Sequence, residues 1–457
     1  VASDGSQAND SSGNPSISAD GRYVAFSSSA SNLVPGDTNG YSDIFFHDLA
    51  TGTTARISVT SDGSQANRSS AYPFISADGR YVAFFSESTN LISGDTNGKS
   101  DVFVHDREMG ITNRISIASN GTQANYQSFS PAISADGRYV AFTSTASNLI
   151  PGDTNGFSDV FIHDQLTGTT TRISIASNGA QANGHSSTNC PPSISANGRY
   201  VAFSSSASNL APDDTNGYGD VFFHDRATGV TSRISVTSDG NQANNSSDCS
   251  SISADGRYVA FQSGASNLVP GDINGTVDVF IRDQVTGETT IASASSDGNQ
   301  ANDGSGSSSI SANGHYVAFF SWASNLVPGD TNGTSDVFVH NRVANELSAK
   351  KPPVIVVHGW QGLSFDGGYR CSDGIQRYNG FNSTLTPDET LDNYSHLAEW
   401  LEQDGYEVWI AHLESGPTST PSLTQNAGCL QKQIETVWNQ NPQPISLISH
   451  SMGGLVS

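Results

Sequence analysis

The sequence is organised around the decamer Ile17-Ser-Ala-Asp-Gly-Arg-Tyr-Val-Ala-Phe26. Close copies of this decamer follow at intervals of 58, 58, 61, 58 and 58 residues, beginning at Ile75, Ile133, Ile194, Ile252 and Ile310. One unit is therefore written six times, and it fills about three quarters of the 457 residues. A long repeat of nearly constant period indicates a fold in which one supersecondary unit is stacked in tandem.

Each unit has the pattern of four short antiparallel strands. In the strand that follows the Ala77-Asp-Gly turn, Tyr81 and Ala83 lie on one face and Val82 and Phe84 on the other, which predicts burial on both sides. In the second unit we expect strands at 73–76, 80–86, 101–106 and 113–118. Four antiparallel strands per tandem unit predict the blades of an all-β propeller.

The repeated segments Ser76-Ala-Asp-Gly-Arg-Tyr-Val-Ala-Phe84 and Asp101-Val-Phe-Val-His-Asp106 are similar to the blade signature of the TolB-type, WD40-like (PD40) propeller family. The resemblance covers roughly residues 1–346 and implies a disc with a central channel used for binding. Six blades are visible. A seventh is left open, because residues 1–9 match 59–67 and so begin inside a unit. The sixth unit has no clear fourth strand, and a strand from a segment that precedes residue 1 would close that blade.

The pattern changes after a predicted linker at 347–353. In the remaining residues, 354–457, apolar runs alternate with amphipathic ones. We expect strands at 354–357, 406–413 and 444–449, and helices at 390–403 and 422–439. This alternation predicts an α/β domain with a parallel sheet, which makes the chain a multidomain protein.

The segment Ile445-Ser-Leu-Ile-Ser-His-Ser-Met-Gly-Gly454 runs from an apolar strand into a turn of small residues. It resembles the nucleophile elbow of the α/β-hydrolase family, in which the residues two before and two after the nucleophile must be small. Ser449 and Gly453 meet that requirement. The resemblance implies that Ser451 is the catalytic nucleophile.

A second segment, Val354-Ile-Val-Val-His-Gly-Trp-Gln-Gly362, resembles the oxyanion loop of lipase-like members of the same family. It implies that the backbone N–H groups of Trp360 and Met452 hold the oxyanion, and that His358 supports the loop. Residues 354–457 therefore resemble the N-terminal portion of a hydrolase domain that ends just after its elbow.

In this family the acid and the histidine of the catalytic triad follow the nucleophile in the sequence. Both are accordingly expected beyond Ser457. His396 and His412 are expected to be structural or surface histidines, and His450, which adjoins Ser451 on the elbow, is expected to project elsewhere. A serine without a positioned base is a weak nucleophile. This polypeptide by itself is therefore expected to be inactive, whereas the full-length protein is expected to hydrolyse esters.

The function that these motifs favour is an exported serine hydrolase of the lipase or esterase type. Its substrate would be an ester or a lipid, and its propeller would gate the site or bind a protein or a glycan. One alternative is a prolyl-oligopeptidase-like serine peptidase, because that family also carries a propeller before its hydrolase domain. Another alternative is a non-catalytic binding or scaffold protein, since propellers host many functions.

A polar loop, Asp37-Thr-Asn-Gly-Tyr-Ser-Asp43, precedes the third strand of each unit and keeps its two Asp, its Asn and its Gly in all six copies. The later copies begin at Asp95, Asp153, Asp214, Asp272 and Asp330. Oxygen ligands at alternating positions are typical of calcium loops, so Asp37, Asn39 and Asp43 with their equivalents are candidate calcium ligands. The alternative is an Asx turn that caps the strand. No other cofactor is expected.

A histidine ends the third strand in five units, at His47, His105, His163, His224 and His340, and Arg282 replaces it in the fifth unit. Because arginine is not a metal ligand, a ring of metal-binding histidines is not expected. The column instead predicts a repeated hydrogen bond between blades.

The formal net charge of −24 makes nucleic acid an unsuitable partner, and the longest apolar runs are too short to span a membrane. Two of the four cysteines, Cys190 and Cys249, lie in neighbouring units, and Cys371 and Cys429 lie in the C-terminal region. One disulfide in each region is predicted. Disulfides indicate a secreted or periplasmic protein.

Overall fold

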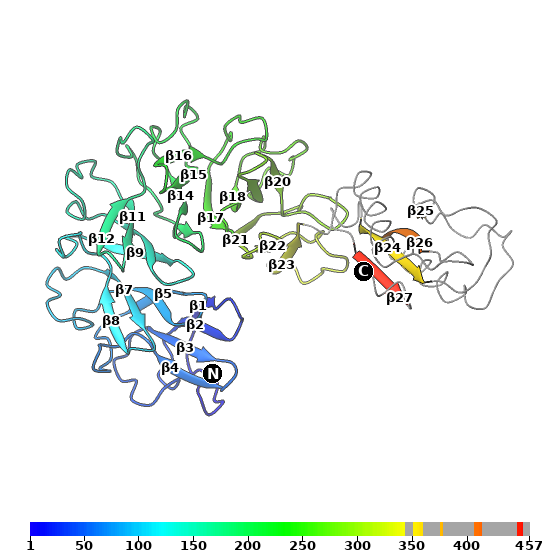
Figure 1. Cartoon of the computed structure of the whole chain (residues 1–457). Coiled ribbons are helices and arrows are strands. Elements are labelled where there is room, and N and C mark those ends of the chain that lie inside the picture. Colours follow the sequence, from blue (N-terminus) through cyan, green and yellow to red (C-terminus); the bar gives the residue numbers. More distant parts are fainter. Residues whose placement is uncertain (343–350, 360–374, 378–405, 414–445, 451–457) are drawn as a thin grey trace, which may run out of the picture. The chain divides into compact units, whose positions relative to one another are not determined.

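The computed structural model describes residues 1–342, 351–359, 375–377, 406–413 and 446–450 (Figure 1). The chain divides into two compact units, Val1–His340 and Asn341–Ser457. The helices expected at 390–403 and 422–439, and the cysteines Cys371 and Cys429, lie outside the described residues. Among the residues that are described, no helix is long and apolar enough to cross a membrane.

The first unit contains six antiparallel sheets in sequence order. The first two are β1 (Ser12–Ile17), β2 (Tyr23–Ser28), β3 (Asp43–Asp48), β4 (Thr53–Arg56) and β5 (Ser70–Ile75), β6 (Tyr81–Ser86), β7 (Asp101–Asp106), β8 (Ile111–Arg114). The next two are β9 (Ser128–Ile133), β10 (Tyr139–Ser144), β11 (Asp159–Asp164), β12 (Thr169–Arg172) and β13 (Ser193–Ile194), β14 (Tyr200–Ser205), β15 (Asp220–Asp225), β16 (Val230–Arg233). The last two are β17 (Ser247–Ile252), β18 (Tyr258–Ser263), β19 (Asp278–Asp283), β20 (Thr289–Ile291) and β21 (Ser305–Ile310), β22 (Tyr316–Ser321), β23 (Asp336–Asn341).

In every sheet the strands pair in the order in which they occur in the sequence. The sixth sheet has three strands among the described residues. Consecutive sheets meet through their first strands, as β1 does with β5 and β17 with β21 (Figure 1). These sheets are the blades of a six-bladed, all-β propeller, as the repeats predicted.

The fourth strand, which is described in the first five blades, is shorter than predicted. In the second blade β8 ends at Arg114, whereas the expected strand ran from 113 to 118. The ladder stops because the buried Ser116 hydroxyl accepts the bond from the Val102 N–H (3.1 Å) and donates to Asp101 (2.6 Å). Beyond it the Ile117 N–H turns back to the Ile115 carbonyl (2.7 Å), so the chain leaves the sheet.

The apolar core lies between blades rather than inside them. Ile44 and Phe46 of the first blade pack with Val82, Phe84 and Leu91 of the second, and each of these side chains is at most 3% exposed. Val82, Ala83 and Phe84 are fully buried, which confirms the prediction that the second strand is covered on both faces. A blade therefore buries much of its apolar surface against its neighbours.

A second contact repeats at each junction between described blades, and we call it the interblade joint. The Tyr81 ring of the second blade lies against the bare backbone of Gly137 in the third, where a methyl group would overlap the ring. Beside it the Ala77 N–H donates to the Ala135 carbonyl of the third blade (3.0 Å). The same tyrosine–glycine contact joins Tyr23 to Gly79, Tyr139 to Gly198, Tyr200 to Gly256 and Tyr258 to Gly314.

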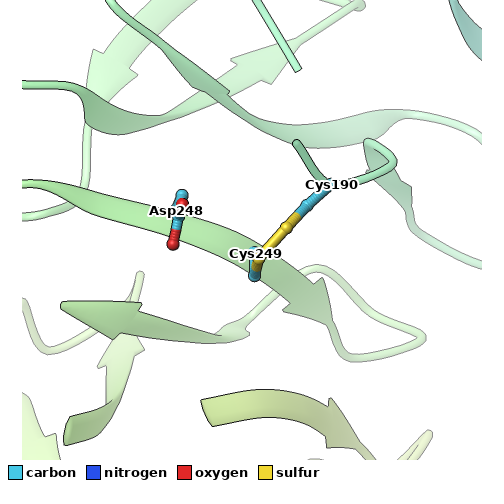
Figure 2. A group of neighbouring side chains, drawn as sticks. All are labelled: Cys190, Asp248 and Cys249. Carbon is cyan, nitrogen blue, oxygen red and sulfur yellow. A yellow bond between two sulfur atoms is a disulfide. The ribbon is translucent and has the colours of Figure 1, made fainter. Parts of the chain in front are cut away.

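A disulfide reinforces one of these junctions. Cys190, before β13, is bonded to Cys249 in β17, so that the fourth and fifth blades are covalently linked (Figure 2). This confirms one of the two predicted disulfides. Asp248 lies close to the two sulfur atoms, but the sulfurs are bonded to each other and cannot serve as metal-binding thiolates.

The second unit contains a four-stranded sheet in the order β25-β26-β24-β27. Its strands are β24 (Lys351–Gly359), β25 (Ile375–Arg377), β26 (Tyr406–Leu413) and β27 (Ser446–His450). β24 pairs in parallel with both β26 and β27, and β25 is antiparallel to β26. β24 begins at Lys351, inside the segment predicted to be the linker.

The interblade joint predicts unequal costs for two glycine substitutions in the third blade. Gly137 and Gly168 both have left-handed φ angles, +75° and +70°. In Gly168→Ala the new methyl group contacts no other atom, so the free energy of unfolding should fall only by the roughly 1–2 kcal/mol that a left-handed alanine costs. In Gly137→Ala it should fall by about 1–3 kcal/mol more, because the methyl group collides with Tyr81. Chemical denaturation of both variants measures this difference, and equal losses would show that the joint contributes nothing.

Candidate functional sites

The hydrolase motifs belong to two neighbouring strands of the second unit. β24 and β27 are paired from Val354–Ser446 to His358–His450. Because the two strands are parallel, the chain leaves both at the same edge of the sheet. His358 lies in β24, whereas Trp360, Ser451 and Met452 are outside the described residues.

The pair of aspartates that recurs in the propeller loops is bound to an arginine in four blades. In the first blade the Arg56 guanidinium is 3.1 Å from Asp37 and 3.4 Å from Asp43. Arg114, Arg172 and Arg233 occupy the equivalent places, at 3.0–3.5 Å from their two aspartates. Burial raises the pKa of Asp43, and the bonds from Ser58 and Asn39 together with Arg56 oppose that rise.

In these four blades the arrangement favours the Asx turn, the alternative to a calcium loop. The side-chain oxygen of Asn39 accepts a bond from the Tyr41 N–H (2.9 Å), and its NH₂ group donates to Asp43 (2.9 Å). The loop is thus an Asx turn, and the positive charge between the carboxylates is a guanidinium rather than an ion. These arginines were not foreseen from the sequence. The available signal was their constant position two residues before a serine that follows the fourth strand.

The fifth blade departs from this pattern. Ile291 takes the place of the arginine, and the Gln300 side chain donates instead to Asp272 (2.6 Å) and Asp278 (2.9 Å). Burial raises the pKa of Asp278, with Ser293, Asn274 and Gln300 opposing the rise. A neutral amide therefore replaces the guanidinium in this blade.

The histidine column is part of a repeated hydrogen-bond relay. The Nδ1 of His105 lies 2.9 Å from the Thr112 hydroxyl, which itself donates to the Val59 carbonyl in the segment joining the first two blades (2.5 Å). Since the hydroxyl has a single proton and gives it to Val59, His105 must donate to the hydroxyl. Arg282 donates in the same way to Thr289 (3.0 Å). The position requires a donor, which both histidine and arginine supply. The predicted link between blades exists, but the threonine makes it.

Comparison with known proteins gives matches of structure only. No family model and no curated protein sequence matches the chain. TolB from Agrobacterium tumefaciens matches with 16% identity and a TM-score of 0.41, over 74% of this chain and 92% of that one. The propeller domain of the Trilobed protease from Pyrococcus furiosus matches with 12% identity and a TM-score of 0.42, over 72% and 82%. Pyrococcus horikoshii acylaminoacyl peptidase matches with 10% identity and a TM-score of 0.35, over 98% and 74%. The propeller assignment rests on the repeats and sheets of the chain itself.

The buried arginines that pair with the loop aspartates predict a strong dependence of stability on this ion pair. Arg172 is 5% exposed and Asp159 is fully buried, so Arg172→Met leaves two carboxylates without their counter-charge. We expect the free energy of unfolding of this variant to fall by about 3 kcal/mol or more. For Arg22→Met, which removes a side chain that is 43% exposed, it should fall by less than about 1 kcal/mol. Chemical denaturation compares the two variants. Similar losses of stability would contradict the structural role of the arginines that pair with the loop aspartates.

The histidine relay predicts a loss of stability in mild acid. Burial lowers the pKa values of His105, His163 and His224 below the ordinary 6.5. As the pH falls through 6.5 the unfolded chain binds protons that the folded chain resists, so the free energy of unfolding decreases. The melting temperature should therefore fall between pH 7.5 and pH 5.5. His163→Gln, which keeps an N–H donor but does not titrate, should show a smaller fall. An identical pH profile for wild type and variant would exclude this histidine as a cause.

Proposed function

We propose that the protein is an exported serine hydrolase of the lipase or esterase type, with Ser451 as its nucleophile. The observation that carries the proposal is the parallel pairing of β24 with β27, up to His358 and His450. The two hydrolase motifs continue from the ends of these strands, and an oxyanion loop and a nucleophile elbow must start from one edge of a sheet to act on the same carbonyl group.

In the proposed reaction the Ser451 hydroxyl attacks the carbonyl carbon of a carboxylic ester. The oxyanion that forms accepts hydrogen bonds from the backbone N–H groups of Trp360 and Met452, and its collapse expels the alcohol and leaves an acyl-enzyme. Water then releases the acid. His358 has a positioning role beside the oxyanion loop. In the order typical of this family, the histidine that takes the serine proton and the carboxylate that orients it follow the nucleophile.

A serine peptidase is the second candidate, because a propeller precedes the hydrolase motifs, as in the prolyl-oligopeptidase family. Its reaction would follow the same steps with an amine as the leaving group. Met452 favours the ester hydrolase, since those peptidases usually carry an aromatic residue after the nucleophile. Hydrolysis of p-nitrophenyl esters compared with peptide p-nitroanilides distinguishes the two.

The disulfide between Cys190 and Cys249 supports the proposal that the protein is exported to the periplasm or secreted. Disulfides persist in oxidising compartments and are rare in the cytosol. The pairing joins two neighbouring blades of one propeller, which is the arrangement of a structural disulfide.

The nucleophile assignment predicts covalent labelling at one serine. A fluorophosphonate probe should label the protein as its gene encodes it, and Ser451→Ala should abolish the label, because the probe reacts only with an activated serine. Ser449→Ala, two residues away, is the matched control and should keep most of the label. Mass spectrometry of the labelled peptide locates the modified residue. Undiminished labelling of Ser451→Ala would refute the assignment, and p-nitroanilide turnover without ester turnover would favour the peptidase.

A further inference from the structure

The residue after the third strand alternates between arginine and glutamine from the second blade to the fifth. It is Arg107 in the second blade, Gln165 in the third, Arg226 in the fourth and Gln284 in the fifth. This residue faces the preceding blade, so it decides what fills the junction between the two.

At the junctions that carry arginine, the guanidinium fills the space beside the joint tyrosine. The Arg107 guanidinium carbon lies 5.0 Å from the ring centroid of Tyr23 and 3.1 Å from that of Phe46, and the group donates to the Gly79 carbonyl (2.5 Å). Arg226 lies 4.2 Å from the Tyr139 centroid and donates to the Gly198 carbonyl (2.6 Å). Aromatic faces and a carbonyl oxygen together are a favourable environment for a cation.

The junction of the fourth and fifth blades has the same surroundings without the cation. Tyr200 and Phe223 have ring centroids 5.1 Å apart, as have Tyr23 and Phe46. A pocket of about 420 Å³ opens beside them, lined also by Gly256 and Gln284. The Gln284 NH₂ group is buried with no hydrogen-bond partner in the described part of the chain. Within residues 1–342, no side chain donates to the Gly256 carbonyl, the counterpart of the carbonyl that Arg107 uses.

The junction of the second and third blades shows why the glutamine alone does not make such a site. It also has a pocket, of about 400 Å³. There Val104 stands in place of the second aromatic ring, and the Gln165 NH₂ group is bonded to the Gly137 carbonyl. This pocket therefore offers one ring instead of two, and its carbonyl is already occupied.

The neighbouring arginines do not prevent a cation from entering. Arg257 lines the pocket and is paired with Asp283 (2.8 Å). Arg199 lies 4.8 Å from the Tyr200 centroid and is paired with Asp225 (2.8 Å). Arg22 stands in the same relation to Tyr23, at 4.7 Å, and Arg107 nonetheless occupies the first junction. The net charge of −24 further favours the approach of a cation.

We propose that the pocket between the fourth and fifth blades binds a guanidinium group, such as that of an arginine side chain. A guanidinium stacks on aromatic rings and donates to a carbonyl in one plane, as Arg107 does, whereas a lysine ammonium is a compact, strongly hydrated charge. Val230 and Val285, 50% and 74% exposed, line the pocket and would contact the methylene groups of the ligand. This inference is independent of the hydrolase proposal.

Ligand-observed NMR titration of the full chain with N-acetyl-arginine amide tests the site. We expect saturable binding with a dissociation constant on the order of 1 mM. N-acetyl-citrulline amide, which has the same shape without the charge, and N-acetyl-lysine amide should bind at least about tenfold more weakly. Absence of saturable arginine binding, or equal binding of citrulline or lysine, would overturn the proposal.

Two substitutions locate the site by exchanging the natural residues of the two junctions. Gln284→Arg should fill the pocket with the protein's own guanidinium, abolish binding and leave the fold intact. Adding Arg107→Gln to Gln284→Arg should restore binding, because it opens the matching pocket beside Tyr23 and Phe46. Unchanged binding by Gln284→Arg would show that the ligand binds elsewhere. If that variant does not fold, Arg107→Gln alone should still bind more ligand than wild type, and a failure to do so would count against the proposal.

The same titration with a Gly-Arg-Gly tripeptide and with free arginine distinguishes the sources of the guanidinium. Tighter binding of the tripeptide than of free arginine would identify arginine within a peptide chain as the ligand. Tighter binding of free arginine would identify a small molecule. Either result supports a guanidinium site. If neither the tripeptide nor free arginine binds, the proposal is contradicted.

Discussion

The propeller depends on close approach of two blades at a position that has no side chain. The tyrosine of one blade lies against the backbone of a glycine in the next, and an alanine N–H of the first blade donates to an alanine carbonyl of the second. A β-carbon at that glycine would overlap the tyrosine ring, so either the ring or the two sheets would have to move apart. The apolar side chains between the blades, such as Phe46 and Phe84, would then lose their contacts. One steric constraint thus maintains both the spacing of the sheets and the burial of the core.

Much of this could be predicted from the decamer, because its period, its turn glycine and its doubly apolar strand are local properties. Val82 and Phe84 were expected to be buried, and they are. The arginines that pair with the aspartates of the polar loops were not foreseen. Asp-x-Asn-Gly-x-x-Asp fits both a calcium loop and an Asx turn, and the deciding group, Arg56, lies 13 residues beyond the second aspartate on another strand. A spacing rule within one segment cannot show what charge another segment brings to it.

The histidine column and the hydrolase motifs show two further limits. Arg282 interrupts the histidine column, which argues against a metal role for the histidines. Their threonine partner became visible only with the pairing of the third and fourth strands. For the second unit, resemblance assigned roles to Ser451 and Trp360, and backbone pairing added that β24 and β27 are neighbours. Those strands are distant in sequence, and parallel pairing across such a separation leaves no mark on either strand alone.

The interblade joint also bears on how such a chain can change over evolutionary time. Every unit carries the tyrosine on one face and the glycine on the other, so each unit is compatible with any other unit as its neighbour. Unequal recombination that duplicates or removes a whole unit would leave a complete joint at the new boundary. Four of the five intervals between units are 58 residues long, as expected for units that arose by duplication. The Cys190–Cys249 bond is an exception, since it fixes the order of two particular units.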